Sequence, residues 1–305
     1  MKKYVLKILI VNFILLQISC KTKNKNDINL EKTQNNPEYY LGYKYPIPYE
    51  ILINDIVVDK NLEGGKNGAE NLNQYILKNG EQKVEIKVLH PFIEKGGLLS
   101  SQDLSILKAK VYLIEGEEED MTLIKELNFK EIEKKVPLIN QEWSFKATLP
   151  FQLIGWGKSK DLKSFEEDEL KELVVKKFTV LRELLNTGKT RDFMGELEFR
   201  NNEFFIANFF TNSEKNDYLI NLEETFKEHK DKMLPLEDFK LRILGNGRAV
   251  TLERINKHTG QGVLVAEDKS KNILYLNYII LHIPLGKEEL EILRINPLIT
   301  SLDEK

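Results

Sequence analysis

The sequence has a single cysteine and no large excess of charge of either sign. Cys20 is its only cysteine, so no disulfide can form within the chain and no cluster of cysteines can hold a metal. Its 45 basic residues nearly balance its 48 acidic ones, which gives a formal net charge of −3. That balance lacks the basic surface typical of nucleic-acid binding, so we expect no nucleic-acid partner.

Histidine is scarce as well. The four histidines are His90, His229, His258 and His282, and no two of them stand at a metal-ligand spacing. We expect His90 at the surface or as a cap, His282 buried and hydrogen-bonded, and the other two solvated. Because no Ser-His-Asp order, paired carboxylates or redox motif stands out, the sequence predicts no metal, no other cofactor and no catalytic residue.

The N-terminal apolar run is too short for a membrane span. A spanning helix needs about 18 or more apolar residues, whereas this run covers residues 8–16 and is interrupted by Asn12. Lys2 and Lys3 precede it, and the small residue Ser19 stands before the expected cut site. This order is typical of a secretory signal peptide, and we expect residues 1–19 to be cleaved.

The predicted signal ends in the letters QISC, in which Ser19 precedes Cys20. This ending resembles the lipobox of bacterial lipoproteins, and the resemblance covers residues 1–20 only. It implies that the Cys20 thiol receives a diacylglyceryl group and that the new amino terminus is acylated. Gln17 departs from the family pattern, in which leucine is usual at that position. The resemblance implies a lipid-anchored protein of the bacterial cell envelope, facing the periplasm or the exterior.

Two folded regions are predicted after the anchor. Residues 20–44 are rich in Lys, Asn and Gln, so we expect the lipidated cysteine to be followed by a disordered tether. In residues 45–157, apolar triplets flank Asn54-Asp55, a hairpin signal, and apolar residues alternate with polar ones in several later runs. We therefore expect an antiparallel β-sandwich, immunoglobulin-like in architecture.

Residues 158–296 predict an α+β domain. A capping box at Ser164 begins a helix, an aromatic-rich helix follows over residues 190–210, and a third covers about 217–233. About five antiparallel strands follow, two of them joined by the turn Gly245-Asn246-Gly247. This order of elements is similar to the NTF2-like cone, in which helices cover a curved sheet and leave a pocket. We expect residues 297–305 to form a disordered tail.

The functional prediction is a binding or interaction module. Phe193, Tyr275, Tyr278 and His282 are the candidate lining of an apolar ligand pocket, although the same residues could simply fill a core. The partner could be another envelope protein, a glycan or an apolar ligand. Two alternatives stay open: an immunity protein against a toxin delivered into the periplasm, and an enzyme, a hydrolase or isomerase, that uses the pocket. The acidic turn at residues 117–120 is interpreted as a solvated hairpin tip.

Overall fold

The fold is described from a computed structural model that covers residues 36–116 and 120–302. The predicted signal peptide, Cys20, most of the predicted tether and most of the acidic turn therefore lie outside the described residues. Within the described ranges the chain is mostly β, with three antiparallel sheets and five α-helices. None of the helices in these ranges is long and apolar enough to cross a membrane.

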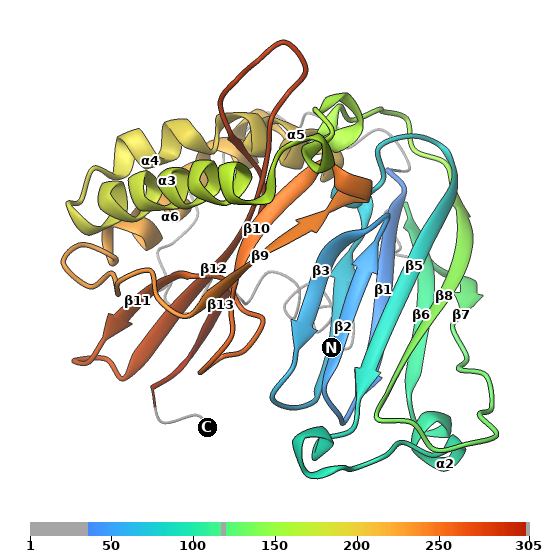
Figure 1. Cartoon of the computed structure of the whole chain (residues 1–305). Coiled ribbons are helices and arrows are strands. Elements are labelled where there is room, and N and C mark those ends of the chain that lie inside the picture. Colours follow the sequence, from blue (N-terminus) through green and yellow to red (C-terminus); the bar gives the residue numbers. More distant parts are fainter. Residues whose placement is uncertain (1–35, 117–119, 303–305) are drawn as a thin grey trace.

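Two four-stranded antiparallel sheets form the N-terminal half (Figure 1). Their strand orders are β4-β1-β6-β7 and β3-β2-β5-β8. The strands are β1 (Glu38–Tyr45), β2 (Tyr49–Ile53), β3 (Ile56–Asn61), β4 (Lys66–Asn71), β5 (Gly80–Leu89), β6 (Lys108–Glu115), β7 (Asp120–Glu126) and β8 (Leu138–Ala147). Leu41 and Val111 of the first sheet share one buried core with Ile51 and Ile86 of the second, so the two sheets pack face to face as a sandwich.

The hairpin predicted at Asn54-Asp55 is confirmed. Both residues have positive φ, 51° and 65°, in the two-residue link between β2 and β3. Asn and Asp tolerate this left-handed conformation, which matches the twist of the flanking strands. The local sequence therefore set this turn.

The C-terminal half contains a five-stranded antiparallel sheet and most of the helices. Its strands are β9 (Phe239–Leu244), β10 (Ala249–Arg254), β11 (Leu264–Asp268), β12 (Ile273–His282) and β13 (Glu291–Ser301). The α-helices are α2 (Ser101–Ser105), which lies in the sandwich, and α3 (Glu167–Asn186), α4 (Thr190–Glu196), α5 (Glu198–Ala207) and α6 (Asn212–Lys227). Short 3-10 helices are η1 (Asn73–Tyr75), η2 (Ile93–Lys95), η3 (Gly155–Lys158), η4 (Leu162–Ser164) and η5 (Gly245–Gly247).

The C-terminal sheet has a different neighbour on each face (Figure 1). On one face, Phe178 of α3 and Phe226 of α6 pack with Ile279 of β12. On the other face, Tyr278 and Ile280 of the same strand belong to the core of the sandwich. Strand β2 is consequently buried along its whole length, because it has a sheet on either side. The two halves share one hydrophobic core.

The structure corrects the ends of the predicted regions. The predicted tether 20–44 includes residues that form β1, which begins at Glu38 and pairs with β4 and β6. The predicted tail 297–305 includes the second half of β13, which pairs with β12 as far as Ser301. In β1 the buried side chains Tyr39, Leu41 and Tyr43 alternate with more exposed residues, and the polar residues before the strand hid this signal. Residues 297–301 carry no such alternation, and their pairing with β12 places them in β13.

The helix starts differ from the prediction too. Ser164 lies in η4, and α3 begins after Glu166, which makes no side-chain cap. A complete capping box starts α6, where the side chains of Thr211 and Glu214 each accept a hydrogen bond from the other residue's backbone N–H. The predicted aromatic helix is two helices, α4 and α5, which meet at Leu197.

Candidate functional site

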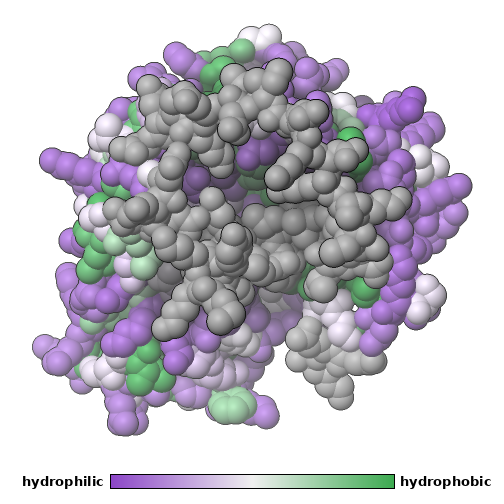
Figure 2. Space-filling model, turned by 180° about the vertical axis from the view of Figure 1, so that it is seen from behind, coloured by the Kyte–Doolittle hydropathy of each residue, from purple (hydrophilic) through white to green (hydrophobic). Residues whose placement is uncertain are grey.

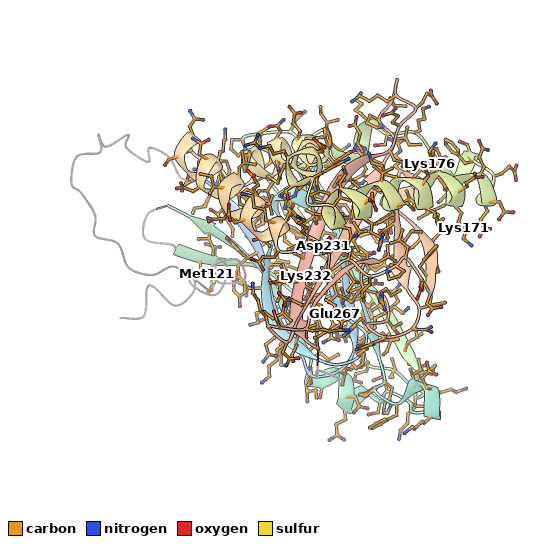
Figure 3. All side chains as sticks on the ribbon, turned by 90° about the vertical axis from the view of Figure 1, so that its left-hand side faces the viewer. Met121, Lys171, Lys176, Asp231, Lys232 and Glu267 are labelled. Atoms are coloured by element: carbon orange, nitrogen blue, oxygen red, sulfur yellow. The ribbon has the colours of Figure 1, made fainter. Side chains whose placement is uncertain are left out.

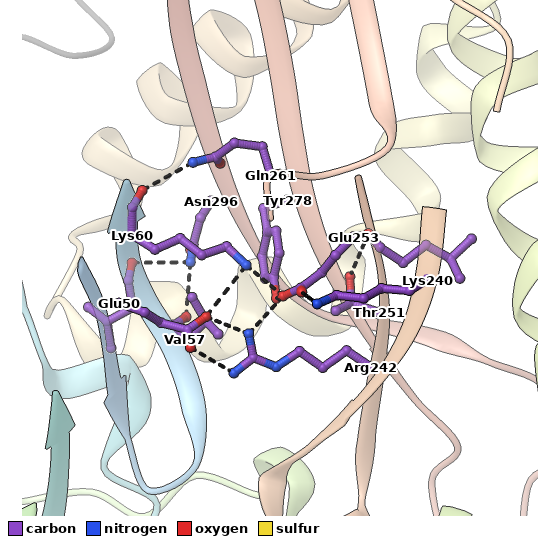
Figure 4. Close-up of polar contacts among 12 residues, drawn as sticks. Glu50, Val57, Lys60, Lys240, Arg242, Thr251, Glu253, Gln261, Tyr278 and Asn296 are labelled. Atoms are coloured by element: carbon purple, nitrogen blue, oxygen red, sulfur yellow. Dashed lines mark hydrogen bonds and ion pairs between the residues drawn. The ribbon is translucent and has the colours of Figure 1, made fainter. Parts of the chain in front are cut away.

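A cluster of buried charges lies where the two halves meet (Figure 4). It consists of Glu50 on β2, Lys60 on β3, Arg242 on β9, Glu253 on β10 and Tyr278 on β12, and we call it the central charge cluster. The side chains of Glu50, Lys60 and Glu253 are 6%, 3% and 2% exposed. Buried charges are unfavourable unless they are paired, so the contacts inside the cluster decide what it does.

Each charge in the central charge cluster has an opposite partner. Lys60 Nζ lies 2.6 Å from Glu253 Oε1 and 3.6 Å from Glu50 Oε1. Arg242 donates from Nη1 to Glu253 Oε1 at 2.8 Å and from Nη2 to Glu50 Oε2 at 3.0 Å. Tyr278 Oη donates to Glu253 Oε1 at 2.8 Å. Two cations and two carboxylates therefore form one neutral network that joins three strands of the C-terminal sheet to two strands of the sandwich.

The pKa shifts follow from this pairing. Burial by itself raises the pKa of Glu253, but Lys60 and Arg242 outweigh burial and lower it to about 2. Burial lowers the pKa of Lys60, and the two carboxylates oppose this shift without cancelling it. Ion pairing therefore holds the network together, and the network connects the two halves of the molecule.

A second buried ion pair joins the halves at another point. Arg294 Nη1 on β13 lies 2.9 Å from Glu203 Oε2 on α5, and its Nη2 donates to the Gln74 carbonyl in η1 at 2.6 Å. Glu203 Oε1 also accepts from the Gly155 backbone N–H at 2.6 Å. Because these partners come from η1, η3, α5 and β13, the halves are joined at two separate points.

The edge of the sandwich holds a cluster of tyrosines and carboxylates. Tyr49 Oη donates to Asp59 Oδ2 at 2.6 Å, and Tyr43 donates to the same oxygen. Lys66 Nζ lies 3.2 Å from Asp59 and 3.7 Å from Glu70. Burial and the nearby Asp59 raise the pKa of Glu70 to about 7. Because the single Tyr43 proton goes to Asp59, a protonated Glu70 can donate to Tyr43 across the 3.4 Å between them.

Two of the four histidines lie where the sequence predicts. His90 Nδ1 accepts a hydrogen bond from the Phe92 backbone N–H at 3.1 Å, which is a capping role. His282 is buried, and its Nδ1 lies 2.7 Å from Ser159 Oγ, so the predicted buried and hydrogen-bonded role is confirmed. Burial lowers the pKa of His282 to about 4, which keeps the imidazole neutral at pH 7.

The predicted solvation of the other two histidines is wrong, because His229 and His258 are both buried. His229 Nδ1 donates to the Thr225 carbonyl at 3.1 Å, and its Nε2 accepts from Asn277 Nδ2 at 3.1 Å. Burial lowers its pKa to about 4. Polar sequence neighbours concealed this burial, since the partner Asn277 lies on a strand far along the chain.

The four predicted pocket residues do not line one pocket. Phe193 and Tyr275 lie in the core beneath the helices, whereas Tyr278 belongs to the core shared with the sandwich. His282 and Tyr278 are separated by an even number of positions on β12, so their side chains lie on the same face of the sheet, the face towards the sandwich. All four are buried, and the sheet separates one pair from the other. This corrects the expected common lining, because successive side chains on a strand point to opposite faces.

A shallow pocket of about 140 Å³ lies elsewhere, on the face of the C-terminal sheet that is turned away from the helices. We call it the basic pocket, and its lining residues are Leu234, Arg254, Lys257, His258, Val265, Glu267, Leu274 and Leu302. Figure 3 labels Glu267 near Lys232, whose backbone carbonyl accepts from the Glu267 N–H at 2.9 Å. Among residues 36–116 and 120–302, no group of three or more His, Cys, Asp or Glu side chains could hold a metal ion.

The surface carries one notable apolar edge. Among residues 36–116 and 120–302, strand β7 is at the end of its sheet and pairs only with β6. Met121 and Leu123 on this strand are 55% and 47% exposed, and they stand beside Ile114 and Tyr112 of β6. Figure 3 shows Met121 at the outer limit of the molecule. On the face seen in Figure 2, by contrast, the visible apolar residues form small patches among hydrophilic ones.

Sequence reasoning missed the central charge cluster, the edge cluster of tyrosines, the basic pocket and the edge of β7. One signal was available for the first of these. Glu50 is the only charge in β2, and Lys60 follows the apolar start of β3. A single charge within an otherwise apolar strand indicates a buried pair. Comparisons with protein-family models, with curated proteins and with solved structures found no match, so the function is argued from these residues.

Proposed function

We propose that this protein is a lipid-anchored binding module of the bacterial cell envelope that recruits a partner protein through the free edge of β7. The observation that carries the proposal is the exposed apolar edge formed by Met121 and Leu123. An extended segment of the partner would add a strand beside β7, with main-chain hydrogen bonds supplying affinity and side-chain contacts supplying specificity.

The composition of β7 supports this role. Edge strands commonly carry inward-pointing charges, proline or bulges that prevent pairing with another chain. Residues 121–124 of β7 read Met-Thr-Leu-Ile, with Asp120 at one end and Lys125 and Glu126 at the other. The irregularity in the pairing with β6 lies at Ile124, because Val111 pairs with Lys125 and Tyr112 pairs with Leu123. Residues 121–123 are therefore the regular part of this edge.

The rest of the molecule supports the proposal by acting as a rigid base. The two halves share one core, and two buried ion-pair networks join them. A rigid surface loses little conformational entropy on binding, so more of the contact energy appears as affinity. In finer detail, we infer an immunoglobulin-like sandwich, and an NTF2-like relation between helices and sheet in the C-terminal half, both from the order of elements.

The edge can be tested by a matched pair of substitutions. Leu123→Lys places a charge on β7, and Ile220→Lys places one on α6, where Ile220 is 60% exposed. Both variants should keep the wild-type Tm, since surface substitutions are usually within about 0.5 kcal/mol. A photo-crosslinking residue at position 121 of the full chain, in the cells that make it, should label one protein, and Leu123→Lys should abolish that labelling while Ile220→Lys leaves it. Equal labelling in both variants, or labelling of many proteins, would overturn the proposal.

The anchor is tested separately. Cys20→Ser removes the thiol that the lipobox resemblance marks for acylation. The variant should lose incorporation of a labelled fatty acid and should move from the membrane fraction to the soluble fraction, because two or three acyl chains supply nearly permanent attachment. Unchanged fractionation together with unchanged labelling would show that Cys20 does not carry the anchor, without bearing on the edge of β7.

A further inference from the structure

The basic pocket combines an apolar floor with a charged rim. The floor is made of the aliphatic side chains Leu234, Val265, Leu274 and Leu302. The rim is made of Arg254, Lys257, His258 and Glu267. Binding sites for small molecules have this composition, in which apolar surface supplies affinity and a few polar groups fix the orientation.

Arg254, like Lys257, is a rim cation that makes no ion pair with a carboxylate of the described residues. It is half-buried, and its Nε donates to the Lys257 carbonyl at 2.8 Å. In the described part of the chain, its guanidinium makes no other hydrogen bond and no carboxylate oxygen lies within 4.0 Å of it. Burial lowers its pKa, although Asp238 and Glu63 oppose that shift from a greater distance. The guanidinium therefore keeps two amino groups to offer to an anion.

Arg242 donates to two carboxylates, and Arg294 donates to Glu203 and to a backbone carbonyl. Arg200, which is buried, donates to Asn201 and Tyr218 and has no carboxylate partner among the described residues. Carboxylates and phosphates match the planar fork of a guanidinium and bind it through two parallel hydrogen bonds. Among the described residues Arg254 has no such partner, and unlike the buried Arg200 it lines the apolar pocket.

The size of the pocket limits the ligand. A cavity of about 150 Å³ holds a benzene-sized group, and the basic pocket has about 140 Å³. The apolar part of a ligand that fills this volume has about six carbon atoms. Glu267 on the rim has Lys269 3.8 Å away as its partner, and its negative charge favours a ligand with one negative charge over a ligand with two.

We propose that the basic pocket binds a small anionic amphiphile, whose head pairs with Arg254 and Lys257 and whose tail of about six carbons lies on the aliphatic floor. This site is independent of the edge of β7, which belongs to the sandwich. The head can be a carboxylate or a phosphate monoester, since both present paired oxygens to the guanidinium.

Calorimetric titration of the purified full-length protein with a set of short-chain compounds tests the proposal. Hexanoate should bind, hexanol and acetate should bind at least tenfold more weakly, and hexyl phosphate shows whether a second charge is tolerated. Affinity should rise by about fourfold per methylene from butyrate to hexanoate and then level off at longer acids, because the floor is filled. Equal affinity for hexanol and hexanoate, or no saturable binding of hexanoate, would overturn the proposal.

Three variants locate the site. Arg254→Gln should weaken hexanoate binding by about tenfold or more, whereas Arg191→Gln, an exposed arginine on α4, should leave it unchanged. Leu302→Ser, beyond the end of β13, should weaken hexanoate binding more than acetate binding. Thermal unfolding of each variant shows that it is folded. Unchanged hexanoate affinity in folded Arg254→Gln would place the binding elsewhere.

Discussion

Replacing Lys60 by methionine tests the central charge cluster most directly. Methionine keeps most of the length of the side chain and removes its charge, so Arg242 is left as the one cation of the central charge cluster, with the exposed Lys240 3.6 Å from Glu253. The cluster then holds one cation for two carboxylates, and breaking a buried pair in this way costs about 3–5 kcal/mol. The pKa of Glu253 agrees with this in direction, because Lys60 and Arg242 together hold it well below its usual value.

Lys240 provides the matched control. Its Nζ lies 3.6 Å from the same Glu253 carboxylate, but its side chain is 59% exposed. Exposed pairs contribute little, so Lys240→Met should cost less than about 1 kcal/mol. Combining Lys60→Met with Glu253→Gln restores the neutrality of the cluster. The double variant should lose about 1–3 kcal/mol less stability than the two single variants lose in sum.

The assay is urea unfolding at pH 7, followed by tryptophan fluorescence and by circular dichroism. Trp156 is buried in the core that both halves share, so the two signals should report one transition. The reasoning is refuted if Lys60→Met loses no more stability than Lys240→Met. It is refuted as well if the double variant loses the full sum of the single losses, because the charges would then act independently.

Three further predictions concern titration and packing. The pKa values of His229 and His282 are each lowered from 6.5 to about 4, so their contribution to folding stability is complete above pH 6.5 and is lost as the pH falls towards 4. Replacing either histidine by Asn should therefore reduce the loss of stability that urea unfolding measures across this pH range. The pKa of Glu70 is raised to about 7, so its contribution to folding stability is present below pH 4.5 and is lost as the pH rises through 7. The stability of Glu70→Gln should hardly change over that rise, and a pH profile identical to that of the wild type would contradict the raised pKa. Gly262→Ala should lower stability by about 1–3 kcal/mol or more in urea unfolding, because its Cβ would lie 2.0 Å from the Asn277 carbonyl oxygen, whereas Gly195→Ala, with nothing within 4 Å, should not destabilise the protein.

Several elements could be predicted from the sequence because short-range patterns specify them. The alternation of Val84, Ile86 and Val88 predicted a strand with one buried face, and β5 has that face. The turn at Gly245-Asn246-Gly247 lies between β9 and β10 as expected, with positive φ at all three residues. Such signals act within a few residues, so they require no knowledge of what packs above or below.

The candidate sites could not be predicted in the same way. Glu50 and Glu253 are about two hundred positions apart, and each looks like an ordinary solvated charge among its sequence neighbours. The pocket expected around Tyr275 and Tyr278 divided between two cores, because the packing partners of β12 decided what each of its faces meets. Arg254 could be identified only from the structure, in which no carboxylate oxygen of a described residue lies within 4.0 Å of its guanidinium.

By itself, the sequence determined the class of fold, the main turns and the lipobox-like segment that ends at Cys20, because these depend on residue type and local spacing. Only the tertiary structure decided that the two halves share a core, that three charges are buried between them beside the half-buried Arg242, that β7 is an edge strand among the described residues and that Arg254 lines an apolar pocket. The physical reason is that burial and pairing are properties of contacts between distant segments. A charge on a strand is solvated or buried according to the sheet that packs against it.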